Sequence, residues 1–326
     1  MPANLSPEYK AAEETFRKAK TKEEKLAALE EMLAVIPKHK GTEKLQAEIR
    51  KRLSKLRAVE EQKGGSGPQS NPYLVEPQGA GQIVLIGFPN VGKSTLVGRL
   101  TNAKTTAAQY PFSTGVPIPG MMPFRDILIQ LVDTPPVTEE GIPGPLMATL
   151  QNADAFLVMV DASSDDCLEQ LTETIQMLKQ RRLVRDEIPE GGRALTMDQV
   201  LLAANKFDSS TAADNLALIR ELWEGPELLP ISAEHGHGLE QLRESCFAVL
   251  DIIRIYTKAP GKDPDMDSPF VLKRGSTVLD LAEQIHKEVA ENLKGAKLWG
   301  TSAKFDGQNA ALEHLLEDED IVELKA

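Results

Sequence analysis

Short, unbroken apolar segments recur along the middle of the chain, and a polar or glycine-containing turn follows each of them. The clearest are 83–86, 127–132, 200–204 and 228–231. Apolar segments of this length are typical of strands that are buried on both faces, as in a parallel sheet covered by helices. A helical pattern at 96–100 follows the first segment. We therefore predict an α/β domain with a mostly parallel sheet flanked by helices at residues 80–262.

A helical period dominates the first sixty-odd residues instead. Apolar residues lie on one face of each of two predicted helices, namely Leu26, Leu29, Met32, Leu33 and Ile36, and then Leu45, Ile49, Leu53 and Leu56. We predict an N-terminal helical region at 1–63. The following stretch is rich in glycine, serine and proline and interrupts every period, so residues 64–79 are predicted to be a flexible linker.

A third pattern begins near Pro269. Residues 270–275 are predicted to form a strand that ends in a glycine turn, and Ser276-Thr277 precede a helix. The apolar face of that helix comprises Val278, Leu281, Ile285 and Val289. Residues 296–299 and the end of the chain supply two more strands. These elements predict a small separate domain at 268–326.

The turn after the first apolar segment carries a specific motif, G-x4-G-K-S, between a predicted strand and a predicted helix. In that context the motif forms a phosphate-binding loop. Gly87 and Gly92 let the backbone curl, so that N–H groups of the loop, including those of Asn90 and Val91, point at the α- and β-phosphates. Lys93 is expected to reach the β- and γ-phosphates.

Hydroxyl and carboxyl groups complete the phosphate end of this predicted site. Ser94 is expected to offer its hydroxyl to Mg²⁺, and Thr95 is placed to donate to the α-phosphate. Asp133 ends the second apolar segment, where a carboxylate is expected to hold Mg²⁺ through the metal's water ligands. Thr114 is the candidate switch threonine, whose hydroxyl and carbonyl close over Mg²⁺ and the γ-phosphate.

The turn after the third apolar segment indicates which base is bound. Asn205-Lys206-Phe207-Asp208 ends in a carboxylate that can accept from guanine N1–H and the exocyclic amino group, whereas adenine presents an acceptor and no amino group there. ATP would leave the carboxylate unpaired, so GTP is the predicted nucleotide. Ser232 and Ala233, after the fourth segment, bring a backbone N–H near guanine O6. Because ligands of open α/β sheets bind at the carboxyl ends of strands, these motifs predict one pocket.

Together, four motifs resemble those of the Obg superfamily of GTPases, and specifically the developmentally regulated GTP-binding proteins. They are G-F-P-N-V-G-K-S-T (87–95), Y-P-F-S-T (110–114), N-K-F-D (205–208) and I-S-A (231–233). The C-terminal segments L-W-G-T-S-A-K and L-E-D-E-D resemble the TGS domain, a small β-grasp sheet, and the resemblance covers most of residues 80–326. It implies a P-loop GTPase with a C-terminal TGS domain that contacts RNA or the ribosome. Docking of that domain to a protein is the alternative.

One motif departs from the family. The chain has Asp133-Thr134-Pro135-Pro136 where the family has D-x-P-G. The amide of that glycine normally contacts the γ-phosphate, and proline has no N–H. Neither glutamine nor histidine follows to position a water, since the next residues are Val137 and Thr138. The sensing of GTP against GDP, or hydrolysis itself, is therefore in question.

Asn90 has two interpretations. The resemblance implies that this asparagine holds a K⁺ ion, which would supply positive charge to the transition state as an arginine finger does. Alternatively, Asn90 shapes the loop because asparagine tolerates the left-handed backbone conformation. The residues assigned to catalysis are Lys93, Thr114 and Asn90.

Composition indicates where the protein works. Among 326 residues only Cys167 and Cys246 are cysteines, too few for a disulfide framework, and small buried apolar residues are their simplest role. The N-terminus has no basic segment followed by an apolar core, and no apolar run approaches membrane-spanning length. We expect a cytoplasmic protein of two or three domains with no membrane contact.

Charge is spread unevenly. Residues 1–63 hold 15 lysines and arginines against 11 acidic residues, although the whole chain has a net charge of −12. The basic excess gathers in the predicted helix that carries Leu45 and Leu56, and just before it: Lys38, Lys40, Lys44, Arg50, Lys51, Arg52, Lys55 and Arg57. This stripe could contact RNA phosphate, but no aromatic residue interleaves it, and a solvated helix face is the commoner meaning of such a charge run.

Three functions remain open on the sequence alone. The first is a slow, Mg²⁺-dependent GTPase that acts as a ribosome- or RNA-associated switch. The second is a nucleotide-dependent binding module with negligible turnover, because of Pro135-Pro136. The third is a scaffold whose terminal domains recruit a protein partner while the nucleotide stabilises the fold.

Overall fold

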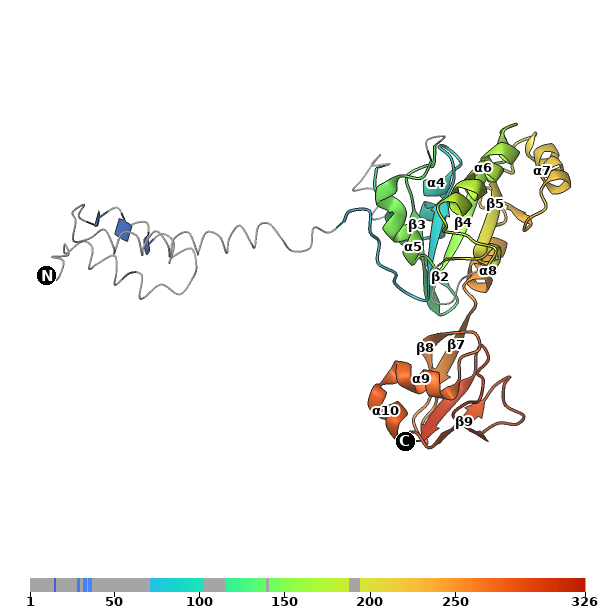
Figure 1. The fold of residues 1–326 in the computed structure, drawn as a ribbon. Helices are drawn as coiled ribbons and strands as arrows, with labels where there is room; N and C mark the ends of the chain where they lie inside the picture. The colour runs from blue at the N-terminus through green and yellow to red at the C-terminus, as the bar shows by residue number, and fades with distance from the viewer. Residues whose placement is uncertain are drawn as a thin grey trace. The chain divides into compact units, whose positions relative to one another are not determined.

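The computed structural model describes most of the chain beyond residue 70 (Figure 1). The described residues are 71–101, 115–138, 141–187 and 194–325, together with Thr15, 28–29, 32–33 and 35–36. The chain divides into two compact units, Met1–Asn71 and Pro72–Ala326. Thr114 and the basic stripe lie outside the described residues, so what the sequence predicts for them stays a prediction.

In the first unit, the described residues include Leu29, Met32, Leu33 and Ile36 of the first apolar face predicted above. Leu29 is fully buried, Ala28, Met32 and Ile36 are almost completely buried, and Leu33 is half-buried. The backbone is helical at residues 28–29 and 32–33. This burial agrees with an amphipathic helix that packs its apolar face inside the unit.

The second unit contains a six-stranded sheet in the order β2-β3-β1-β4-β5-β6. Strand β2 is antiparallel to β3, and the other four neighbouring pairs are parallel. The predicted class, a mostly parallel α/β sheet, is confirmed. The strands are β1 (Gln82–Ile86), β2 (Ile118–Phe124), β3 (Ile127–Asp133), β4 (Ala155–Asp161), β5 (Val200–Asn205) and β6 (Leu228–Pro230).

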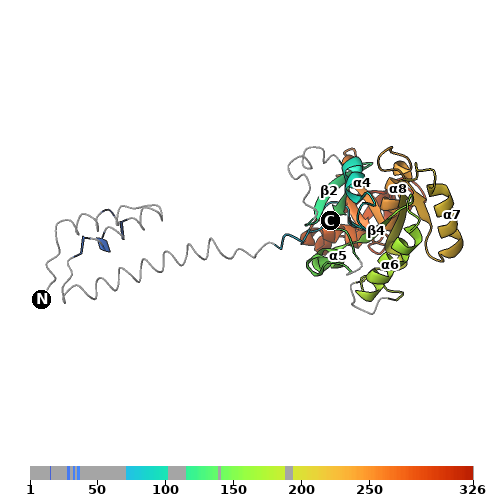
Figure 2. The same cartoon turned by 90° about the horizontal axis from the view of Figure 1, so that it is seen from above.

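Helices cover both faces of this sheet. On one face lie α4 (Lys93–Leu100) and α8 (Leu239–Val249), and on the other lie α5 (Met147–Asn152), α6 (Cys167–Gln180) and α7 (Ala212–Leu222). Figure 2 shows α4 and α8 on the side of β4 opposite to α5 and α6. Side chains alternate between the two cores because successive residues of a strand point to opposite faces. Short 3-10 helices occupy Gly144–Leu146 and Met197–Gln199.

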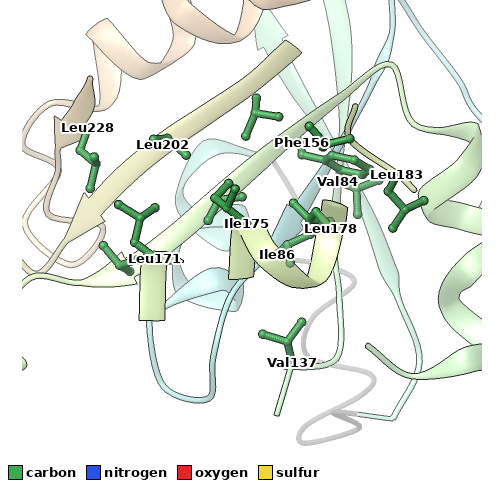
Figure 3. Packing of buried hydrophobic residues seen from close by; sticks show 14 of the residues in the cluster. Val84, Ile86, Val137, Phe156, Leu171, Ile175, Leu178, Leu183, Leu202 and Leu228 are labelled. Carbon is green, nitrogen blue, oxygen red and sulfur yellow. The ribbon is translucent and has the colours of Figure 1, made fainter. Parts of the chain in front are cut away.

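Helix α6 illustrates how the sequence pattern produces the packing (Figure 3). Leu171, Ile175 and Leu178 recur at spacings of four and three residues, so they share one face of the helix. They pack against Val84 and Phe156 from neighbouring strands, and all five side chains are buried. Full burial of one such side chain contributes about 1.5–3 kcal/mol.

A second sheet follows in the order β10-β9-β11-β7-β8. Its strands are β7 (Ile252–Thr257), β8 (Asp265–Lys273), β9 (Gly295–Trp299), β10 (Gln308–Ala310) and β11 (Ile321–Lys325), with β7 and β11 parallel. Helix α9 (Val278–Ile285) begins at Thr277, which forms a capping box with Asp280. The predicted single helix is interrupted at His286, where the backbone is extended, and α10 (Lys287–Asn292) carries Val289.

The boundary between the two sheets differs from the prediction. Strand β7 falls within the region assigned to the first domain, 80–262, yet it pairs with β8 and β11 of the second sheet. The second sheet therefore begins at Ile252 rather than near residue 268. A parallel central strand buried on both faces has the same apolar character as the strands of the first sheet, so the pattern alone does not reveal which sheet it joins.

The described end of the predicted linker also differs from the prediction. Val75 is buried in the core of the first sheet, and its N–H donates to Thr149 Oγ1 at 2.9 Å. Gln78 N donates to Gln130 Oε1 at 3.2 Å, and Gly79 pairs with Ile129. Residues 75–79 are thus attached to the domain, which restricts any flexible linker to the residues before them.

Cys167 and Cys246 are both buried, in agreement with the role predicted for them. Burial raises the pKa of the Cys246 thiol to about 12, which keeps it protonated and unreactive. Within the residues that the structure describes, no helix combines the length and apolar character needed to cross a lipid bilayer.

Candidate nucleotide-binding site

The predicted motifs lie at one edge of the first sheet. The loop 87–92 follows β1, Asp133 ends β3, Asn205 ends β5, and residues 231–233 follow β6. Because β1, β3, β5 and β6 all belong to the parallel part of the sheet, their carboxyl ends meet at the same edge.

The two glycines of the loop are required by their surroundings. Gly92 adopts φ 96°, and a Cβ there would lie 2.2 Å from the Asn205 side-chain nitrogen. A Cβ on Gly87 would lie 2.4 Å from the carbonyl oxygen of Met159. Gly92 is also the N-cap of α4, so the loop ends at a helix N-terminus that favours anions.

Lys93 lies inside the loop with only 7% of its surface exposed. Its Nζ donates to Gly87 O at 2.8 Å and to Phe88 O at 3.1 Å. Burial lowers the pKa of Lys93 to about 8, although the charge of Asp133 opposes this shift. Burial therefore disfavours the charged form of Lys93. A bound phosphate would stabilise this ammonium group.

Asp133 and Ser94 lie together beside Lys93. Ser94 Oγ donates to Asp133 Oδ2 at 2.5 Å. Burial raises the pKa of Asp133, and the bond from Ser94 and the charge of Lys93 oppose that increase. The other carboxylate oxygen, Oδ1, is buried and has no hydrogen-bond partner among the described residues.

This orphaned oxygen tests whether the residues fit a magnesium ion. A buried anionic oxygen without a donor is costly, and a cation or its water ligand would satisfy it. A serine hydroxyl and a carboxylate are hard oxygen ligands of the kind that Mg²⁺ prefers. Ser94 and Asp133 therefore fit the metal. Thr114, the third predicted ligand, lies outside the described residues.

Asn90 is exposed at the tip of the loop and adopts φ 63°. A left-handed backbone is what the structural interpretation of this residue requires. An exposed side chain also leaves its amide free to bind a cation, so both interpretations stand. Thr95 is exposed in the first turn of α4.

The segment from Pro135 to Val137 has no free amide near the loop. Thr134 Oγ1 donates to Leu85 O at 2.5 Å, and Val137 N donates to Gly87 O at 3.1 Å. Pro135 and Pro136 have no N–H. From Pro135 to Val137, therefore, no backbone donor is left for a γ-phosphate.

Asn205 joins the phosphate loop to the loop after β6. Its Nδ2 donates to Val91 O at 2.8 Å, and its Oδ1 accepts from Ala233 N at 2.9 Å. The sequence prediction directed a backbone N–H near Ala233 at guanine O6. Since the N–H of Ala233 itself is bound to Asn205, a donor to O6 must come from a neighbouring amide of that loop.

Asp208 is exposed beside Ser232. A hydrogen bond from Ser232 is the main cause that lowers the pKa of Asp208, and His235 lowers it further. The carboxylate is therefore ionised at neutral pH and available as an acceptor. Lys206 Nζ contacts Asp161 Oδ2 at 2.5 Å, which fixes this lysine at the end of β4.

Two contacts of the site were not predicted. Arg99, the penultimate residue of α4, donates to the carbonyls of Ala233 and Glu234 and so holds the loop after β6. Asp161, at the end of β4, pairs with Lys206. Asp161 could have been predicted, because it directly follows an apolar run. Nothing in the sequence indicates that Arg99 contacts the loop after β6.

Comparisons with known proteins agree with this geometry. The family described as 50S ribosome-binding GTPase matches residues 82–189, and the TGS domain matches residues 253–326. An uncharacterized GTP-binding protein of Methanocaldococcus jannaschii is 29% identical over 360 aligned positions, with 92% of each chain covered. Developmentally-regulated G-protein 3 of Arabidopsis thaliana is also 29% identical, over 92% of this chain and 98% of that one.

The crystal structure of a GTP binding protein from Pyrococcus horikoshii OT3 matches 75% of this chain and 99% of its own, at 17% identity and a TM-score of 0.49.

The fold and the matched families define a P-loop GTPase domain followed by a TGS domain. The Obg superfamily, in the branch of the developmentally regulated GTP-binding proteins, fits these matches, and the chain is a GTP-binding protein of that type.

Proposed function

We propose that the protein hydrolyses GTP slowly with Mg²⁺ and acts as a cytoplasmic switch that associates with the ribosome or its RNA. The observation that carries the enzymatic part is the grouping of Lys93, Ser94 and the orphaned oxygen of Asp133 beside the phosphate loop. The match to the family described as 50S ribosome-binding GTPase supports the ribosomal part.

The chain's own residues have distinct roles in this proposal. The loop amides and Lys93 would bind the phosphates, while Ser94 and Asp133 would hold Mg²⁺. When bound, Mg²⁺ neutralises charge on the β- and γ-phosphates. Asn205 fixes the distance between the phosphate loop and the base loop, and Asp208 reads guanine. Slow turnover follows from the missing amide at Pro136.

Phosphate release from GTP tests the enzymatic part. We expect a rate on the order of 10⁻³ s⁻¹ or less, the range of GTPases that lack an arginine finger. Phosphate release should stop when EDTA removes Mg²⁺, and it should also stop in Ser94→Ala. Ser276→Ala, which lies outside the site, should release phosphate at the wild-type rate. No release above the uncatalysed rate would instead indicate a binding module without turnover.

Ribosome co-sedimentation tests the partner. We expect the protein to pellet with ribosomes in the presence of a non-hydrolysable GTP analogue and to remain in solution with GDP. Equal recovery with both nucleotides, or none with either, would contradict a nucleotide-controlled association and favour a protein partner for the TGS domain.

Asp208→Asn should shift the preference from guanine toward xanthine nucleotides, because an amide donates to the xanthine carbonyl where the carboxylate accepted from the amino group. GDP affinity should fall by on the order of 100-fold and XDP affinity should rise. Calorimetric titration measures both, with the exposed Asp214→Asn on α7 as a matched control. Retained preference for GDP would place guanine recognition elsewhere.

Pro136→Gly should raise the ratio of GTP to GDP affinity about tenfold, because a restored amide could donate to the γ-phosphate and such a bond nets roughly 1.5–3 kcal/mol. The added backbone freedom of glycine would offset part of this gain. Titrations with GDP and a non-hydrolysable GTP analogue measure the ratio. Pro135→Gly is the control, since it adds the same freedom and an amide one residue earlier. An unchanged ratio in Pro136→Gly would mean that the segment does not sense the γ-phosphate through this position.

Potassium should accelerate hydrolysis about tenfold relative to sodium if Asn90 helps to hold a cation against the phosphates. Asn90→Gly removes the amide but accepts the same left-handed backbone, so it separates the two interpretations. Loss of the potassium effect in this variant supports a cation site. Equal rates in the two salts, measured at matched ionic strength in the wild type, would leave Asn90 with its structural role only.

A further inference from the structure

A histidine that the sequence did not indicate lies against the carboxylate assigned to guanine. His235 Nδ1 lies 3.4 Å from Asp208 Oδ2 and 3.2 Å from Ser232 Oγ. The backbone N–H of His235 also donates to Ser232 Oγ at 3.2 Å. The three residues form a closed group at the base end of the site.

The loop that carries His235 is held in place by its backbone. Ser232 N donates to His237 O at 3.0 Å, and Gly236 N donates to Ser232 O at 2.8 Å. Arg99 holds the loop from α4 through the carbonyls of Ala233 and Glu234. The position of the imidazole is therefore set by the fold, even though 54% of the side chain is exposed.

The hydrogen atoms of the group determine which atoms donate. Nδ1 lies 3.4 Å from Asp208 Oδ2. Without a hydrogen, Nδ1 would direct its lone pair at this carboxylate oxygen, so the charge of Asp208 favours the tautomer with the hydrogen on Nδ1. Ser232 Oγ, 3.2 Å from Nδ1, then accepts from the ring, and the hydrogen of the Ser232 hydroxyl is available to Asp208.

We propose that His235 is a positioning residue for guanine recognition, whose Nδ1–H acts with the Ser232 hydroxyl to fix the orientation of the Asp208 carboxylate. An ionised carboxylate offers about four acceptor positions. Two donors from the protein leave the remaining positions for guanine N1–H and the 2-amino group. Fixing the rotamer beforehand lowers the ordering cost of binding. This inference rests on the role proposed above for Asp208.

Neighbouring groups do not offer a substitute. Lys206 is paired with Asp161 at 2.5 Å. The ring of His237 lies 6.2 Å from that of His235, measured between centroids, and is exposed. His237 therefore provides a matched control, because it is the same residue type in the same loop.

The experiment compares GDP with inosine diphosphate, which lacks the 2-amino group. His235→Ala should weaken GDP binding about three- to tenfold, the effect of one hydrogen bond, and weaken inosine diphosphate less, so that the ratio of the two affinities falls about threefold. His235→Asn places an amide nitrogen near the position of Nδ1 and should restore both values to within about twofold of wild type. His237→Asn should match the wild type.

Several results would overturn the proposal. They are wild-type affinities in His235→Ala, an equal loss for both nucleotides, or no restoration in His235→Asn. Asp208→Asn separates this inference from the proposed function. If that variant still prefers GDP to XDP, Asp208 does not read guanine and both fail. If it switches preference while His235→Ala remains like wild type, only the inference about His235 fails. Thermal melts should show unchanged folding, as His235 is exposed.

Discussion

Replacing Lys93 with alanine is expected to abolish tight binding of GDP and GTP, with a loss of about 100-fold or more. The Lys93 ammonium lies at the phosphate loop, on the carbonyls of Gly87 and Phe88. Charge-assisted bonds to phosphate contribute roughly 1.5–3 kcal/mol each, and a 100-fold loss corresponds to about 2.7 kcal/mol. The folded domains should persist, because burial already disfavours this charge and lowers its pKa to about 8.

Calorimetric titration with GDP measures the effect. Lys179→Ala is the matched control, since that lysine is exposed and its one ion pair among the described residues is with Asp186 at 3.0 Å. Circular dichroism melts check that both proteins are folded. Wild-type GDP affinity in Lys93→Ala would contradict the assignment of the phosphate loop.

The phosphate end of the site was predictable because its chemistry depends on contiguous residues. The spacing from Gly87 to Ser94 contains the loop, the lysine and a metal ligand, and a strand precedes it and a helix follows it, as predicted. Asp133 and Asn205 were found because each directly follows an apolar run. These are local signals, which a single sequence carries in full.

Contacts that form between distant segments were not predictable in the same way. The reach of Arg99 to the carbonyl of Ala233 depends on how α4 packs beside the loop after β6. His235 approaches Asp208 only because that loop folds back on Ser232. No period or motif encodes either distance, since both result from tertiary packing.

Some strands were not predicted because their residue patterns were ambiguous. Strand β2 contains Pro119 and Pro123, which argue against a central strand, but β2 is at the edge of its sheet and both prolines are exposed. Strand β7 was assigned to the wrong domain because its apolar run resembles that of any buried strand. Arg254 within it was the clue, since a charge in a buried strand requires a partner from elsewhere.

Arg254→Met is expected to lower the free energy of unfolding by about 3–5 kcal/mol, the cost of leaving buried charges unpaired. The guanidinium is 3% exposed and lies 2.8 Å from Asp126 Oδ1 and 2.8 Å from Asp318 Oδ2, with Glu319 Oε1 at 2.5 Å. Asp126 also accepts from the Tyr256 hydroxyl. Asp126 lies in the turn between β2 and β3 of the GTPase domain, whereas the other residues belong to the TGS domain, so the cluster joins the two domains.

Two variants separate this cluster from ordinary surface pairs. Arg274→Met removes an exposed arginine that pairs with Asp251 at 3.0 Å, and it should cost less than about 1 kcal/mol. Arg254→Met combined with Asp126→Asn should lose less than the sum of the single changes, because the second change removes a carboxylate that the first one left unpaired. Additive losses would mean that the two residues do not interact across the domains.

The effect of Arg254→Met should depend on pH in a defined direction. Burial alone would raise the pKa of Asp126, but the hydrogen bonds from Tyr256 and then from Arg254 outweigh it and hold the pKa below its usual value. A lowered pKa in the folded state contributes stability above the unfolded value of about 3.9, and that stability is lost as the pH falls through the folded pKa. The free energy of unfolding of wild type should therefore exceed that of Arg254→Met by the largest amount at neutral pH, and this difference should shrink below about pH 4. Urea unfolding measures it, with Trp223 reporting on the GTPase domain and Trp299 on the TGS domain. A difference that stays constant down to the acid limit would show that packing, rather than the charge of Asp126, determines the loss.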